Sequence, residues 1–78
     1  MIIAKVSKSG KIEKVYHNYE VAARTENVNS GDVGRVAKGI RNHVAGLKFI
    51  TLSPKVARTI TKNLGEKFGA VSAKKAGL

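Results

Sequence analysis

The chain contains no cysteine and no tryptophan, and only five of its 78 residues are acidic. Without cysteine, neither a disulfide nor a thiolate metal site can brace the fold, and a cytoplasmic, reducing compartment is expected. No apolar run approaches the roughly 18–20 residues of a membrane-spanning helix. The apolar stretch at residues 1–4 is too short for a secretory signal, because the charged Lys5 follows it directly. We therefore expect one small domain without disulfides and without a membrane segment.

The acidic residues are also too few and too scattered for common catalytic sites. Neither a phosphate-cradling nucleotide loop nor a nucleophile and base at a recognisable spacing occurs in the sequence. A two-metal nuclease centre would need clustered carboxylates, and the two histidines cannot replace them. The sequence predicts a non-catalytic protein that uses no metal and no cofactor.

Basic residues are plentiful and unevenly placed. Lysine and arginine number 15, which gives a formal net charge of +10. Residues 1–34 hold five basic and four acidic groups, a net of +1, whereas residues 35–78 hold ten basic groups and Glu66 alone, a net of +9. Such concentration indicates a polyanionic partner, and the missing tryptophan favours nucleic acid over a membrane surface. The alternative is a charged surface that serves only solubility.

Local patterns predict an α+β domain in the order ββααβα. Two β-branched runs, Ile2–Val6 and Lys11–Tyr16, flank a turn at Gly10 and predict a hairpin. A third strand is expected over 47–52, and Ser53-Pro54 predicts the start of a third helix that ends near Gly65. The domain is expected to span residues 1–71, followed by a mobile basic tail over 72–78.

Between the hairpin and the third strand, the spacing is typical of a helix-turn-helix. Asn18 predicts the cap of a first helix that runs to about residue 26, and Ser30 predicts the cap of a second. A helix-turn-helix needs a small residue, a turn residue, an apolar plug and two buried branched residues at fixed intervals. These places hold Ala23, Asn27, Val28, Val33 and Val36. Glu26 departs from the pattern, because an apolar residue is more usual just before the turn. An ordinary helical hairpin is the alternative.

The second helix, expected over about residues 31–39, separates into two faces. At 100° per residue, Val33, Val36, Ala37 and Ile40 fall within about 100° of one another, and Arg35, Lys38 and Arg41 fall on the other side. The third helix divides likewise, with Lys55, Arg58 and Lys62 opposite its apolar stripe. Both helices are therefore expected to present cations to solvent.

The stretch from Gly10 to Leu52 resembles the modular DNA-binding repeat of intron-encoded homing nucleases and nuclease-associated phage proteins. The matching segments are Gly10-Lys11-Ile12, Val15-Tyr16, Glu20-Val21-Ala22-Ala23, Asn29-Ser30-Gly31-Asp32-Val33, Arg35-Val36-Ala37-Lys38-Gly39 and Arg41–Phe49. Two positions depart from the family: Gly34 replaces a polar residue, and Ala45 replaces the first of two glycines. The resemblance implies a DNA-binding helix-turn-helix of phage or mobile-element type, acting as a transcription regulator or DNA-coating protein in the nucleoid or the host cytoplasm.

The sequence thus predicts a non-catalytic protein that binds double-stranded DNA, with the second helix in the major groove and the third helix and tail on phosphates. The expected contact residues are Ser30, Gly31, Arg35, Lys38, Arg41, His43, Lys55, Arg58 and Lys62. One alternative is a small basic factor that binds an acidic host protein. Another is a structured-RNA binder, since 31–34 fits Gly-x-x-Gly, although Asp32 would repel the RNA backbone.

Overall fold

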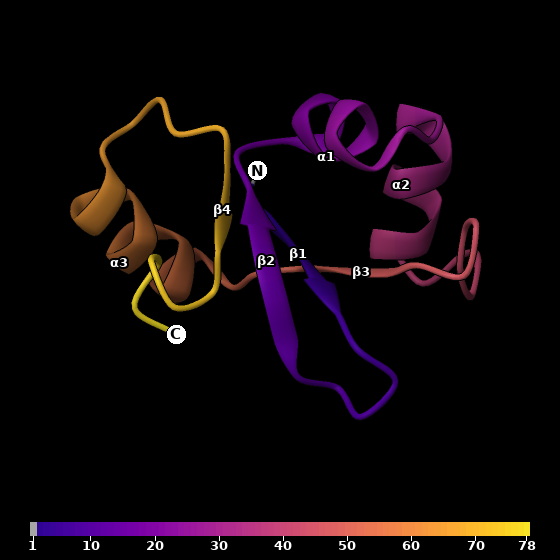
Figure 1. Ribbon diagram of the computed structural model, residues 1–78, viewed down its shortest axis with the longest axis horizontal. Coiled ribbons are helices and arrows are strands. Elements are labelled where there is room, and N and C mark those ends of the chain that lie inside the picture. Colours follow the sequence, from indigo (N-terminus) through magenta and orange to yellow (C-terminus); the bar gives the residue numbers. More distant parts are fainter. Residues whose placement is uncertain (1) are drawn as a thin grey trace.

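The computed structural model describes residues 2–78. The elements along the chain are β1 (Ile3–Val6), β2 (Ile12–Tyr16), α1 (Tyr19–Glu26), α2 (Ser30–Ala37), β3 (Lys48–Thr51), α3 (Pro54–Leu64) and β4 (Ala70–Ser72) (Figure 1). The strands form one antiparallel sheet in the order β3-β1-β2-β4. The predicted α+β fold is confirmed, and the predicted order ββααβα is extended by a fourth strand.

The hairpin forms where the sequence predicted it. Ile3 pairs with Tyr16, and the turn closes through a hydrogen bond of 2.9 Å from Gly10 N–H to the Ser7 carbonyl. Gly10 has φ of +85°, a backbone conformation open to glycine at little steric cost. The third strand then pairs with the free edge of β1, where Val6 lies opposite Lys48.

The sequence did not predict β4. Its three residues pair with β2, with Val71 opposite Val15, and are too few to show a period of two. The segment after it lies within the expected basic tail and buries Ala76, which is only 1% exposed. Backbone hydrogen bonds from Ala76 N–H to the Ser72 carbonyl and from Leu78 N–H to the Ala73 carbonyl hold this segment in turns.

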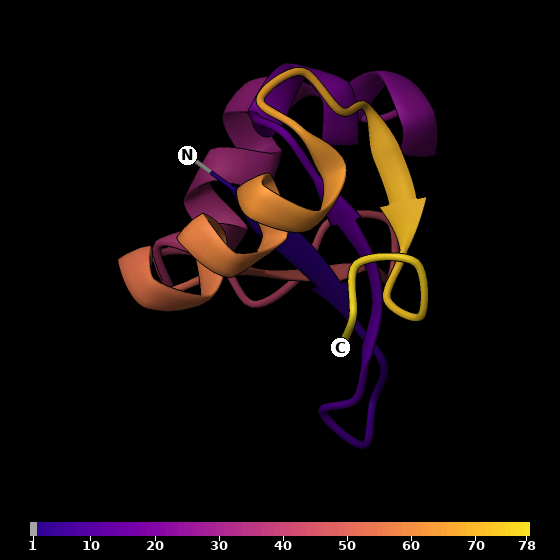
Figure 2. The same cartoon turned by 90° about the vertical axis from the view of Figure 1, so that its left-hand side faces the viewer.

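The sheet separates two hydrophobic clusters, because successive residues of a strand point to opposite faces. On one face, Ile3, Tyr16 and Phe49 pack with residues of α1 and α2. On the other, Ala4 and Val15 pack with Ile60 of α3. The pair α1–α2 and the helix α3 therefore cover opposite faces of the sheet, as both views show (Figures 1 and 2).

Asparagine residues fix the boundaries of α1 and α2. Asn18 caps α1 by accepting from Val21 N–H at 2.9 Å, and Asn27 ends it in the left-handed conformation with φ of 58°, both as predicted. The cap of α2 was predicted wrongly. Asn29, not Ser30, accepts from Gly31 N–H at 2.8 Å, and Ser30 is the first helical residue. An asparagine amide oxygen caps as well as a serine hydroxyl, so the sequence offers both positions.

The third helix follows its predicted boundaries. Ser53 Oγ accepts from Val56 N–H at 3.3 Å, Pro54 occupies the first turn, and the helix ends at Gly65. Beyond it, Phe68 packs back edge-on against the imidazole of His17, with ring centroids 5.4 Å apart. The second cluster therefore extends from α3 to the segment that leads into β4.

Candidate nucleic-acid interface

The outer face of α2 presents the cations that the sequence placed there. Val33 and Val36 are buried against the sheet, whereas Arg35 and Lys38 are exposed. The side chain of Arg35 is 58% exposed. The predicted separation of faces is confirmed for these residues. Ile40 was expected on the buried face and is instead 73% exposed, because α2 ends at Ala37 and Ile40 lies beyond its last turn.

A single carboxylate ties two of the predicted contact residues together. Asp32 Oδ1 lies 2.9 Å from Arg35 Nη1 and 3.0 Å from Arg41 Nη1. Arg41 also donates from Nε to the His43 carbonyl at 2.9 Å, so the loop after α2 is fixed to the first turn of the helix. Exposed ion pairs of this kind are weak, about 0–1 kcal/mol each. Replacing Asp32 by a stronger anion would therefore cost the two arginines little.

The two glycines of α2 have different surroundings. A Cβ built on Gly34 would lie 3.5 Å from the ring of Tyr19, so Gly34 is buried between α2 and α1. This position faces the neighbouring helix and not a ligand on the outer face. Gly31 is exposed, but its N–H is bonded to Asn29. One of the backbone donors expected to meet a phosphate at this end of the helix is therefore already satisfied.

Glu26, the residue that departs from the helix-turn-helix pattern, lies in a polar network beneath the turn. Tyr16 donates from its hydroxyl to Glu26 Oε2 at 2.5 Å, and Lys5 Nζ lies 3.2 Å from Oε1. Burial alone would raise the pKa of Glu26, but the bonds from Tyr16 and Lys5 and the charges of Lys5 and Lys14 outweigh it and lower that pKa. Burial, followed by the bond to Glu26, raises the pKa of Tyr16. A carboxylate is tolerated here because the strands supply both partners.

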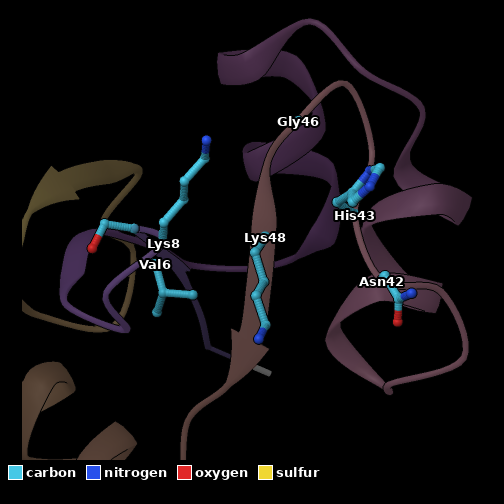
Figure 3. A pocket seen from close by; sticks show the side chains of 7 residues that line it. Val6, Lys8, Asn42, His43, Gly46 and Lys48 are labelled. Carbon is cyan, nitrogen blue, oxygen red and sulfur yellow. The ribbon is translucent and has the colours of Figure 1, made fainter.

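Sequence reasoning missed two cations that lie beside the loop after α2. A pocket of about 190 Å³ opens between the hairpin turn and this loop (Figure 3). Lys8 reaches it from the hairpin, Lys48 from β3, and Asn42 and His43 from the loop, with the two lysine side chains pointing in opposite directions. The antiparallel pairing of β1 with β3, which sets Val6 opposite Lys48, brings these segments together, and that pairing is not visible in any local pattern.

The loop itself ends in a tight turn. Val44 and Leu47 exchange backbone hydrogen bonds of 3.0 and 2.8 Å, and both residues between them have positive φ, 51° at Ala45 and 77° at Gly46. A left-handed alanine costs about 1 kcal/mol more than glycine. Both central positions of the turn therefore hold the left-handed conformation that glycine adopts at least cost.

The remaining predicted contact residues lie elsewhere. Lys55, Arg58 and Lys62 are exposed on α3, and α3 packs on the face of the sheet opposite α1 and α2. The structure thus groups Ser30, Gly31, Arg35, Lys38, Arg41 and His43 on one side and the three cations of α3 on another.

Within residues 2–78, no three histidine, aspartate or glutamate side chains gather where they could hold a metal ion. Over the same residues, no helix is both long and apolar enough to cross a membrane. Comparisons of the chain with protein-family models, with curated proteins and with solved structures gave no match.

Proposed function

We propose that the protein binds double-stranded DNA through α2 and the loop after it, residues 30–43, and catalyses no reaction. The observation that supports this most is the division of α2 into a buried face with Val33 and Val36 and an exposed face with Arg35 and Lys38. The helix is joined to α1 by a short turn around Asn27, as the second helix of a DNA-binding helix-turn-helix is. In such motifs this helix enters the major groove.

The chemistry of the exposed face favours phosphate contacts over base reading. Gly31 offers no side chain for base contacts. The phosphates beside the bases would repel the carboxylate of Asp32. Arg35 is the side chain on this helix best suited to reach a guanine edge or a phosphate. The binding we propose is therefore strongly ionic and modestly sequence-selective, as suits a phage or mobile-element protein that coats DNA or regulates transcription.

One observation favours an acidic protein as the partner instead. Ile40 is a large apolar side chain left exposed beside Lys38 and Arg41, and protein interfaces commonly combine an apolar anchor with basic neighbours. In the DNA proposal the same side chain would contact a thymine methyl or sugar surface. Structured RNA is the third possible partner and is separated from duplex DNA by direct competition.

The test is the binding of a labelled duplex at several salt concentrations. The logarithm of affinity should fall with the logarithm of salt concentration, with a slope of about −0.9 for each phosphate neutralised. Arg35→Gln should weaken binding about tenfold more than Lys67→Gln, which removes one charge from an exposed position after α3. A flat salt response, or preference for RNA hairpins in competition, would overturn the proposal. Equal effects of the two variants would show that α2 is not the contact surface.

A further inference from the structure

The outer face of α3 carries exposed cations with no acidic residue in the same helix. These cations are Lys55, Arg58 and Lys62. Within residues 2–78, none of these three forms an ion pair, whereas Arg35 and Arg41 share Asp32 on the other side of the molecule. We call these three residues the α3 face. Its positive charge is unopposed within its own helix.

The α3 face cannot serve the same stretch of DNA as α2. The sheet lies between the two helices, and each helix packs its apolar residues toward the sheet. The exposed cations of α2 and of α3 therefore face away from each other across a body whose longest dimension is 30 Å (Figures 1 and 2). A duplex that touched both would have to fold back around a body of this size. DNA has a persistence length of about 150 base pairs, which strongly opposes such a tight reversal. Any duplex on the α3 face is therefore a second duplex or a distant segment of the first.

The chemistry of the α3 face fits the phosphate backbone better than a membrane or a protein. Its apolar stripe, centred on Ile60, is packed against the sheet and cannot enter a bilayer. Among residues 2–78 the only large apolar side chains left exposed are Ile40 and Leu78, neither of them on α3. Thr59 directs its hydroxyl to the Lys55 carbonyl at 3.2 Å, which leaves mainly cations facing outward. Cations held along one helix, with no acidic residue among them, suit sequence-independent phosphate contacts.

We propose that the α3 face binds a second DNA duplex, so that one protein molecule bridges two DNA segments. This rests on the proposed function of α2 as the first DNA contact. Bridging then needs no oligomer, because the two faces belong to one domain and are held apart by the sheet. The second contact is of the same ionic kind as the first but lacks an opposing carboxylate.

The experiment is capture of a labelled duplex by an unlabelled duplex fixed to beads, with protein as the only link. Two matched triple variants test the faces: Lys55→Gln with Arg58→Gln and Lys62→Gln, and Arg35→Gln with Lys38→Gln and Arg41→Gln. Both remove three positive charges from exposed positions, and Lys67→Gln serves as a single-charge control. Thermal unfolding shows that each variant is folded. Binding to one free duplex is measured in parallel by fluorescence anisotropy.

The native protein should capture the labelled duplex, and each triple variant should reduce capture by about tenfold or more. The α3 variant should keep its affinity for a single duplex within about threefold, because α2 remains intact. If the native protein binds single duplexes but captures none, bridging is wrong while the proposed function stands. If an equal mixture of the two variants restores capture, bridging runs through self-association and the proposal is overturned. If the α2 variant both binds single duplexes and captures the labelled duplex as the native protein does, the proposed function itself fails.

Discussion

Asp32 Oδ1, in the first turn of α2, lies 3.0 Å from Nη1 of Arg41, a residue beyond the end of the same helix. The same oxygen holds Arg35 at 2.9 Å. In the free protein, one carboxylate therefore occupies the place between two guanidinium groups that a DNA phosphate would take in the proposed complex. The side chain of Asp32 is 26% exposed, so an anion that approaches Arg35 and Arg41 also comes close to this carboxylate.

Replacing this carboxylate should strengthen DNA binding and weaken the fold. Asp32→Asn frees Arg35 and Arg41, and since exposed pairs are worth about 0.2–1 kcal/mol each, duplex affinity should rise about two- to thirtyfold. The free energy of unfolding should fall by about 0.5–1 kcal/mol, because an acid in the first turn favours the helix dipole. Anisotropy and urea unfolding measure the two effects. Glu66→Gln, the same removal of charge at an exposed site after α3, should change affinity much less; an equal gain would mean that only net charge matters.

The two glycines of α2 should respond differently to alanine. A Cβ at Gly34 would meet the Tyr19 ring at 3.5 Å, an ordinary contact, so Gly34→Ala should keep most of the helix-propensity gain of up to about 1 kcal/mol. A Cβ at Gly31 would lie 3.0 Å from the capping Oδ1 of Asn29, so Gly31→Ala should gain little or lose stability. Urea unfolding of both variants decides this. A larger gain at Gly31 than at Gly34 would contradict the packing described.

The network beneath the turn should make stability depend on pH in the acid range. The pKa of Glu26 is lowered in the folded state, so its charge contributes stability above the ordinary value of 4.5. That contribution is lost as the pH falls from above 4.5 through the lowered pKa. Glu26→Gln should lower stability at neutral pH and flatten this acid dependence. Tyr16→Phe, which removes a bond to a charged acceptor, should cost about 1.5–3 kcal/mol at pH 7.

Unfolding of the native protein and of both variants between neutral and acid pH measures these effects. An acid dependence as steep in Glu26→Gln as in the native protein would show that other carboxylates cause it.

The pocket beside the loop should extend the DNA contact. Lys8 and Lys48 line this pocket together with Asn42 and His43, and the His43 carbonyl accepts a hydrogen bond from Arg41. The double variant Lys8→Gln with Lys48→Gln should make the salt slope of duplex binding shallower by about 0.9 for each phosphate that is no longer neutralised. Lys11→Gln with Lys67→Gln removes two charges from exposed positions outside the pocket lining and is the matched control. A slope unchanged by the first pair would remove the pocket from the interface.

Local patterns predicted most of the fold, because the hairpin, the Asn18 cap and the Ser53-Pro54 start are set by neighbouring residues. They missed β4, whose three residues depend on pairing with β2. The cations of α2 and α3 were each found from helical periodicity. These cations lie on opposite sides of the molecule because α2 packs on one face of the sheet and α3 on the other. No single segment of the sequence encodes the face on which a helix packs. The neighbours of Glu26 were likewise hidden, since Lys5 is distant in sequence.

The measurement that tests the central claim most directly is a titration of ¹⁵N-labelled protein with a short duplex, followed by amide chemical shifts. The DNA proposal predicts the largest changes over residues 30–43, with Arg35, Lys38 and Arg41 among them, and a second group on α3 when duplex is in excess. Amides of the buried strand β1 should move little. Saturable binding of the duplex with residues 30–43 unmoved would contradict the claim that α2 is the DNA-binding element.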